Sequence, residues 1–229
     1  MRVRSLVLPI LAAGLALAGS PAQASVVFVD SLGSGGFGGL AVLDDFEAFA
    51  PKDVAIFAPI SEFGLTYAPV TVCSTDCPGN IFVSSPGYNN YGLPTTTSSI
   101  FTASGNEFFT ITPGSDLRRI GFDIYTINDP GNIYSVAGAV NVQVSVLTIA
   151  GTTTLSLTPP LGNFGFLGVV SDDPILQITW EADKGGIRNT GIDNIRVSDT
   201  VGAPVPEPST GVVILAGLAA LASRRRRRG

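Results

Sequence analysis

Carboxylates are the main groups in this 229-residue chain that could do chemistry, because the sequence has no histidine and only two cysteines. Histidine is the commonest general base and the commonest zinc or copper ligand. Its absence excludes catalysis by a Ser-His-Asp or Cys-His arrangement. The candidate chemistry is therefore binding of hard cations, or acid and base work by paired carboxylates.

Three of these carboxylates are candidates for a calcium site. Asp45 and Glu47 lie in an acidic segment near the first predicted strands, and Asp193 lies on the last one. The first and last strands of a jelly roll commonly neighbour each other, so oxygen atoms from both would surround a structural calcium ion. The alternative interpretation is a solvated acidic surface without metal.

Two carboxylate pairs could instead serve a glycan hydrolase, Asp172 with Asp173 and Glu181 with Asp183. Adjacent residues of a strand point to opposite faces, which weakens the first pair. The second pair shares a face but lies near a strand end. We therefore expect a protein that is not an enzyme.

One loop and one cysteine pair complete the candidate residues. Tyr88 and Tyr91, beside Asn89 and Asn90, offer the stacking faces and amide groups that sugar recognition uses, although a solvated loop has the same composition. Cys73 and Cys77 are expected to form a disulfide in an exported chain, where oxidation is the default. A metal site at these cysteines would need further ligands.

The chain between its two ends has the pattern of an all-β protein. Short β-branched and aromatic runs are separated by Gly, Pro, Asn and Asp, which is typical of an antiparallel β-sandwich. A glycine-rich stretch at 33–39 lacks the lysine of a phosphate-binding loop and is interpreted as a turn or linker. Eleven strands are expected, at 26–30, 54–59, 65–72, 80–84, 107–112, 119–127, 139–149, 152–157, 164–170, 175–181 and 192–197. So many strands in one domain favour two packed sheets, as in a jelly roll.

The charge is distributed unevenly. Seven of the 13 basic residues lie near the two termini, so residues 25–207 contain six basic and 18 acidic residues and carry a net charge of −12. Such a domain repels phosphate backbones and anionic lipids, so nucleic acid is not expected as a partner. Neutral glycans and soluble cations fit better.

The first 24 residues have the features of a signal peptide. Arg2 and Arg4 precede a short apolar run, and Ala22 and Ala24 provide the small residues of a cleavage site. Signal peptidase is thus expected to release a mature chain that begins at Ser25. The domain assignment is a signal peptide at 1–24, a β-sandwich at 25–203 and a terminal sorting segment at 204–229.

The C-terminal segment contains Pro206, Glu207 and Pro208, then an apolar run at 211–222 and five arginines at 224–228. An apolar run that is followed by arginines halts export, because the arginines stay on the cytoplasmic side. The run is shorter than the roughly 20 residues that span a bilayer comfortably, which favours a transient membrane helix over a lasting anchor.

This order of features resembles the PEP-CTERM sorting tail. The resemblance implies processing by an exosortase, a membrane peptidase of bacteria that have an outer membrane and make exopolysaccharide. The stretches at 164–170, 174–180 and 192–197 also resemble an extracellular β-sandwich found in PEP-CTERM proteins, which looks like a carbohydrate-binding jelly roll. We therefore expect a secreted or surface-attached protein of the exopolysaccharide layer, structural or glycan-binding; a carboxylate-dependent hydrolase and a self-assembling adhesin subunit are the alternatives.

Overall fold

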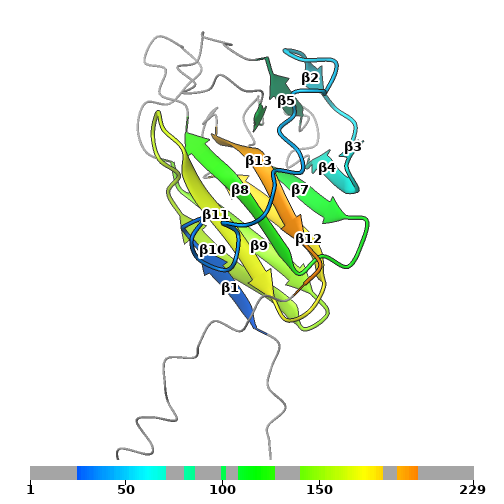
Figure 1. Ribbon diagram of the computed structural model, residues 1–229. Coiled ribbons are helices and arrows are strands. Elements are labelled where there is room, and N and C mark those ends of the chain that lie inside the picture. The colour runs from blue at the N-terminus through cyan, green and yellow to red at the C-terminus, as the bar shows by residue number, and fades with distance from the viewer. Residues whose placement is uncertain are drawn as a thin grey trace, which may run out of the picture.

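The structure, a computed structural model, describes residues 25–70, 80–85, 99–101, 108–126, 140–182 and 190–200. These residues form thirteen strands, which build two antiparallel sheets packed face to face (Figure 1). The expected all-β sandwich is thereby confirmed. The described residues include no helix that could span a membrane, and the apolar runs at 5–18 and 211–222 lie outside them.

The first sheet has seven strands and holds both ends of the described chain. Its order is β1 (Val26–Val29), β11 (Gly165–Ser171), β8 (Arg119–Thr126), β13 (Thr190–Ser198), β6 (Ser99–Phe101), β5 (Ile81–Ser84) and β2 (Ala55–Ile56). Strand β13 pairs with β8 from Thr190 opposite Thr126 to Ser198 opposite Arg119. The last strand is therefore an inner strand of its sheet.

The second sheet has six strands. Its order is β10 (Gly151–Leu157), β9 (Val142–Thr148), β12 (Ile175–Ala182), β7 (Phe108–Pro113), β4 (Leu65–Pro69) and β3 (Ile60–Glu62). Alternation is clearest in β9, where Val142, Val144 and Val146 are buried and Gln143 and Leu147 are exposed.

The core lies between the sheets and is centred on the one tryptophan of the chain. Trp180 of β12 stacks on Phe109 of the neighbouring β7, with ring centroids 6.0 Å apart. Trp180 also makes an edge-to-face ring contact with Phe122 of β8, in the opposite sheet, at 6.3 Å. The indole nitrogen donates a hydrogen bond of 3.0 Å to Thr190 Oγ1 of β13.

All eleven predicted strands are present, with shifted ends. The structure adds β3 and β6, each only three residues long. Three residues carry no readable alternation, so these strands exist because β4 and β13 provide backbone partners for them.

A β-bulge in β13 aligns its side chains with the core. Asp193 lies opposite Asp123 and Arg196 lies opposite Gly121, so two residues of β13 face the single residue Phe122. Asn194 takes up the extra length with a φ of 52°. As a result Ile192 and Ile195, three positions apart, are both fully buried in the core.

The glycine-rich segment covers the outer face of the seven-stranded sheet. Its aromatic residue, Phe37, is fully buried, and its ring contacts Phe166 edge to face at 5.3 Å. A Cβ atom at Gly168 would lie 2.4 Å from the Phe37 ring, and one at Gly121 would lie 2.8 Å from it. Gly121 and Gly168, on adjacent strands, therefore leave the space that the Phe37 ring occupies, and a side chain at either position would fill that space.

We expect Phe37→Ala to destabilise the protein by about 3–5 kcal/mol, since the buried ring would leave a cavity over the sheet. Denaturant unfolding of the variant and the wild type measures the difference. Phe57→Ala is the matched control, because the Phe57 side chain is 60% exposed and its loss should change stability by less than about 0.5 kcal/mol. Equal losses of stability in the two variants would contradict the structural role of the buried Phe37 ring.

Candidate functional site

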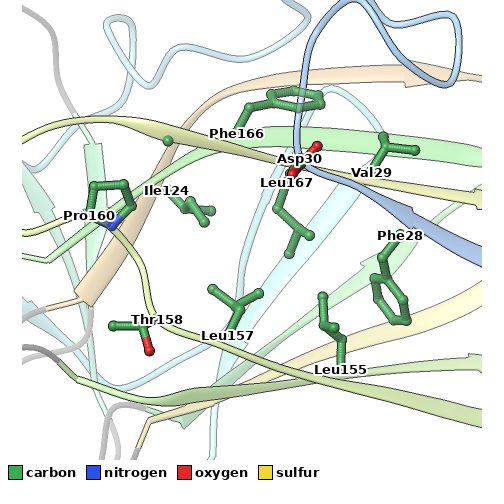
Figure 2. A pocket seen from close by; sticks show the side chains of 11 residues that line it. Phe28, Val29, Asp30, Ile124, Leu155, Leu157, Thr158, Pro160, Phe166 and Leu167 are labelled. Carbon is green, nitrogen blue, oxygen red and sulfur yellow. The ribbon is translucent and has the colours of Figure 1, made fainter.

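Among the described residues, a cavity opens between the outermost strands of the two sheets, on the side where β1 and β10 lie (Figure 2). Its volume is about 510 Å³, a size typical of ligand pockets. We call it the edge groove; its lining comprises Phe28, Val29, Asp30, Ile124, Leu155, Leu157, Thr158, Pro160, Gly165, Phe166 and Leu167. The groove exists because β10 is only partly covered by the opposite sheet, so that Leu155 and Leu157 remain half-buried.

One end of the edge groove is closed by the segment after β10. The Thr126 amide donates to Pro160 O and the Gly162 amide donates to Thr126 O, both at 2.8 Å. These bonds fix the segment to the end of β8. Gly165 allows the close approach, because a Cβ atom there would lie 2.9 Å from the Pro160 ring.

The chemistry of the edge groove is apolar with a polar rim. Phe28, Leu155 and Leu157 point into it in Figure 2. Asp30 at the end of β1 is exposed, and Thr158 Oγ1 donates to Asn141 Oδ1 at 2.9 Å, which leaves the hydroxyl oxygen able to accept. An apolar floor beside a few polar groups can hold a ligand that has both apolar and hydroxyl-bearing faces.

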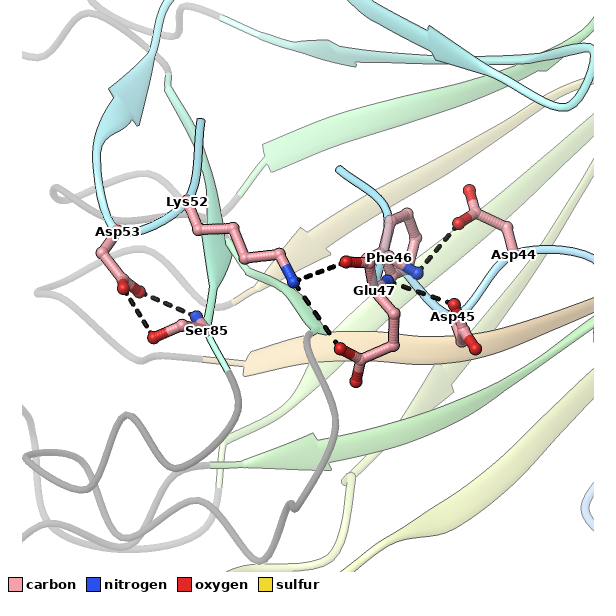
Figure 3. A network of polar contacts seen from close by, with 7 residues as sticks. All are labelled: Asp44, Asp45, Phe46, Glu47, Lys52, Asp53 and Ser85. Atoms are coloured by element: carbon pink, nitrogen blue, oxygen red, sulfur yellow. Dashed lines mark hydrogen bonds and ion pairs between the residues drawn. The ribbon is translucent and has the colours of Figure 1, made fainter. Parts of the chain in front are cut away.

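A second group of polar side chains lies in the acidic segment before β2 (Figure 3). Asp45 Oδ1 accepts a hydrogen bond from the Glu47 amide at 3.1 Å. Lys52 Nζ lies 3.6 Å from Glu47 Oε2 and donates to Glu47 O at 2.9 Å. Asp53 accepts from both the amide and the hydroxyl of Ser85, at 2.8 and 2.6 Å, which ties the segment to the end of β5.

Asp44 is the buried member of this segment. Its Oδ1 accepts from the Phe46 amide and its Oδ2 from the Tyr67 hydroxyl, each at 2.9 Å. Burial raises the pKa of Asp44, and the two hydrogen bonds counteract that rise because they stabilise the ionised carboxylate. Burial also raises the pKa of Glu62, with the carboxylates of Asp44 and Asp45 adding to the effect.

The predicted calcium ligands are held by local contacts. Asp45 and Glu47 make the bonds described above, and the fully buried Asp193 accepts from the Asn194 amide at 2.7 Å. Among the described residues, no group of three or more Asp, Glu, His or Cys side chains is arranged to hold a metal ion. The calcium site stays a prediction.

The premise that brought these residues together was wrong in one respect. The first strand is not a neighbour of the last, because β11 and β8 lie between β1 and β13. The acidic segment itself reaches β13: the Ile195 amide donates to Asp44 O and the Leu43 amide donates to Ile195 O, both at 2.7 Å. The contact with the last strand is thus made by a loop.

The other candidate residues differ in what the structure says about them. Asp172 is occupied by two hydrogen bonds from Ser25, and Glu181 lies in β12. The remaining candidates, Asp183, Tyr88, Tyr91, the Cys73–Cys77 pair and the motif Pro206, Glu207 and Pro208, lie outside the described residues. Sequence reasoning missed the edge groove, whose lining comes from four separate stretches of chain.

Comparison with known proteins identifies the C-terminal segment. Residues 204–228 match the PEP-CTERM protein-sorting motif. The chain is therefore a β-sandwich protein that carries this sorting signal. None of the curated protein sequences matches the chain significantly.

Two solved structures are similar in fold. One is a family 11 carbohydrate-binding module of the cellulosomal cellulase Lic26A-Cel5E of Clostridium thermocellum, with 13% identity and a TM-score of 0.37 over 72% of this chain and 98% of that one. The other is TmCBM61 in complex with beta-1,4-galactotriose, with 8% identity and a TM-score of 0.31 over 58% of this chain and 87% of that one. Likeness at this level assigns no ligand to the present protein.

We expect Tyr67→Phe to cost about 1.5–3 kcal/mol at pH 7, because the hydroxyl donates to an ionised, buried carboxylate. The pKa of Asp44 is raised, so this carboxylate becomes protonated at a higher pH than usual as the solution is acidified. A protonated Asp44 depends less on the hydroxyl, and the difference between variant and wild type should shrink near pH 4. Denaturant unfolding at both pH values checks this; a difference that is constant with pH would contradict it.

Proposed function

We propose that this protein is exported, sorted by an exosortase, and binds a neutral glycan of the exopolysaccharide layer without catalysis. The observation that carries the proposal is the sorting motif at 204–228, which follows the last strand of the β-sandwich domain. A domain placed before such a signal acts outside the cytoplasm.

The edge groove supports binding of a sugar chain. The carbon-bound hydrogens of a sugar ring pack on aromatic and aliphatic side chains such as Phe28 and Leu157, while its hydroxyls bond to groups such as Asp30 and Thr158. The net charge of −12 in residues 25–207 disfavours an anionic polysaccharide. A neutral glycan is the ligand class that meets both conditions.

Two observations support the non-catalytic part of the proposal. The sequence has no histidine, and the Asp172 carboxylate accepts two hydrogen bonds from Ser25. The adhesin alternative corresponds to β10, whose outer edge has no partner among the described strands and whose seven residues include no charge and no proline. The two functions are separable by the measurements below.

The sorting part of the proposal predicts that native protein lacks the C-terminal arginines. Exosortase cleavage near Pro206 would remove the apolar run and residues 224–228. Intact-mass analysis of material recovered from the cell surface measures this directly. Deleting the exosortase gene should restore the full tail mass, whereas recovery of the complete tail from wild-type cell surfaces would overturn the sorting claim.

The binding part predicts that Asp30→Ala and Thr158→Val weaken binding of a neutral polysaccharide about 2- to 10-fold each, the effect of one lost hydrogen bond. Affinity electrophoresis or calorimetry with full-length protein measures the change. Asp116→Ala is the control, since it removes an exposed carboxylate that does not line the groove.

Two outcomes would count against the groove. If Tyr88→Ala or Tyr91→Ala abolishes binding while Asp30→Ala and Thr158→Val bind as the wild type does, the glycan site lies in the loop that contains Tyr88 and Tyr91. Absence of any glycan binding, together with a molar mass that rises with concentration and falls when Thr153 on β10 is replaced by Lys, would favour the adhesin.

A further inference from the structure

The first residue that the structure describes, Ser25, is held by a carboxylate from the turn between β11 and β12. Asp172 Oδ2 accepts a hydrogen bond from the Ser25 backbone nitrogen at 3.1 Å and another from the Ser25 hydroxyl at 2.8 Å. The Asp172 amide donates in return to Ser25 O at 3.2 Å. Three bonds thus converge on the residue just before β1.

The same residue is the expected start of the mature chain, because Ala22 and Ala24 mark a signal-peptidase site after position 24. We propose that removal of the signal peptide creates an α-ammonium group on Ser25 that pairs with the Asp172 carboxylate and locks the edge strand β1 onto β11. This inference rests on the export part of the proposed function and adds a structural role for the processing step.

Hydrolysis changes the chemistry of one nitrogen atom. Water adds across the Ala24–Ser25 peptide bond: its hydroxyl goes to the Ala24 carbonyl carbon and its hydrogen to the Ser25 nitrogen, which takes a second proton from solvent. A neutral amide with one hydrogen becomes an ammonium with three. The bond to Asp172 becomes a charge-assisted hydrogen bond, which is shorter and stronger than a neutral one.

The proposed ion pair between Ser25 and Asp172 acts on strand β1. Strand β1 has four residues and, among the described strands, pairs only with β11, from Val26 opposite Ser171 to Val29 opposite Gly168. Its Phe28 lines the edge groove. An ion pair at the start of β1 therefore holds one wall of the groove in place.

The charges around the pair set its pH dependence. Arg118 lies just before β8, and Asp173 follows Asp172 in the turn between β11 and β12. None of the four residues of β1 is charged, and Asp30 comes directly after them. The hydrogen bonds from Ser25 lower the pKa of Asp172, and Arg118 acts in the same direction. The carboxylate thus contributes stability above about pH 4, which is lost as the pH falls through its lowered pKa.

The ammonium group contributes at the other end of the pH scale. A carboxylate partner favours its charged form, so its contribution is full below the ordinary α-amino pKa of about 7.7–8.0 and is lost as the pH rises above it. In an unprocessed chain the Ser25 nitrogen is an amide, which does not titrate, so its contribution to stability does not change as the pH rises.

The test compares melting temperatures of the processed chain, with its C-terminal segment retained, at pH 6 and pH 9.5. Wild type should exceed Asp172→Asn by about 1–3 °C at pH 6, since the pair is exposed, and the difference should fall at pH 9.5 to the contribution of the remaining neutral hydrogen bonds from Ser25. Ser25→Ala loses the hydroxyl bond but should retain the pH dependence. Asp173→Asn, the neighbouring carboxylate, should behave as wild type at both pH values.

An Ala24→Phe chain supplies the second comparison, because the larger side chain blocks the peptidase and keeps the Ser25 nitrogen an amide. In that background the effect of Asp172→Asn should not change between pH 6 and pH 9.5. N-terminal sequencing separates the two proposals. A wild-type chain that begins at Met1 overturns the export proposal. A chain that begins at another residue, or one that begins at Ser25 but shows a pH-independent effect of Asp172→Asn, overturns the lock and leaves export standing.

Discussion

The contact of Trp180 with the opposite sheet is the interaction on which the sandwich depends most. Its ring packs on Phe109 in its own sheet and on Phe122 across the core, and its nitrogen is satisfied by Thr190 of β13. A buried indole N–H without a partner would cost free energy, so the position of β13 and the packing of the sheets are fixed together. The bulge at Asn194 follows from the same requirement, because it allows Ile192 and Ile195 of β13 to face the core that Trp180 fills.

The acidic segment and the glycine-rich segment are two solutions to one problem: the outer face and the end of the seven-stranded sheet also need cover. Phe37 covers the outer face by means of Gly121 and Gly168. Asp44 extends the sheet by pairing with Ile195 of β13, which buries the Asp44 carboxylate. The Tyr67 hydroxyl and the Phe46 amide donate hydrogen bonds to this carboxylate. Asp44 therefore has a structural role in this segment, through its contacts with β13 and Tyr67.

Sequence reasoning predicted the two sheets and eleven of the thirteen described strands, because alternation such as that of Val142, Val144 and Val146 indicates a half-buried strand directly. It could not reach the groove. Phe28, Ile124, Leu157 and Leu167 are far apart in sequence, and only the order of strands brings them together. The burial of Phe37 was missed for a related reason, since its ring packs on two glycines, which leave no hydrophobic pattern in the sequence. The signal-peptidase site expected before Ser25 rests on local sequence alone and stays a prediction.

The two ends of the described chain lie at one pole of the sandwich. Ser25 bonds to the turn after β11, and Ser198 accepts from the Arg118 amide at the start of β8 (Figure 1). A cell-surface attachment that follows β13 would transmit any pull from a bound polymer along the axis of that strand. Because β13 pairs with β8 over most of its nine residues, such a load acts in shear and must break many backbone hydrogen bonds at once, whereas an edge strand peeled from its end gives way one bond at a time. Under such a load, β13 would be held by the ladder that it shares with β8 from Thr190 to Ser198.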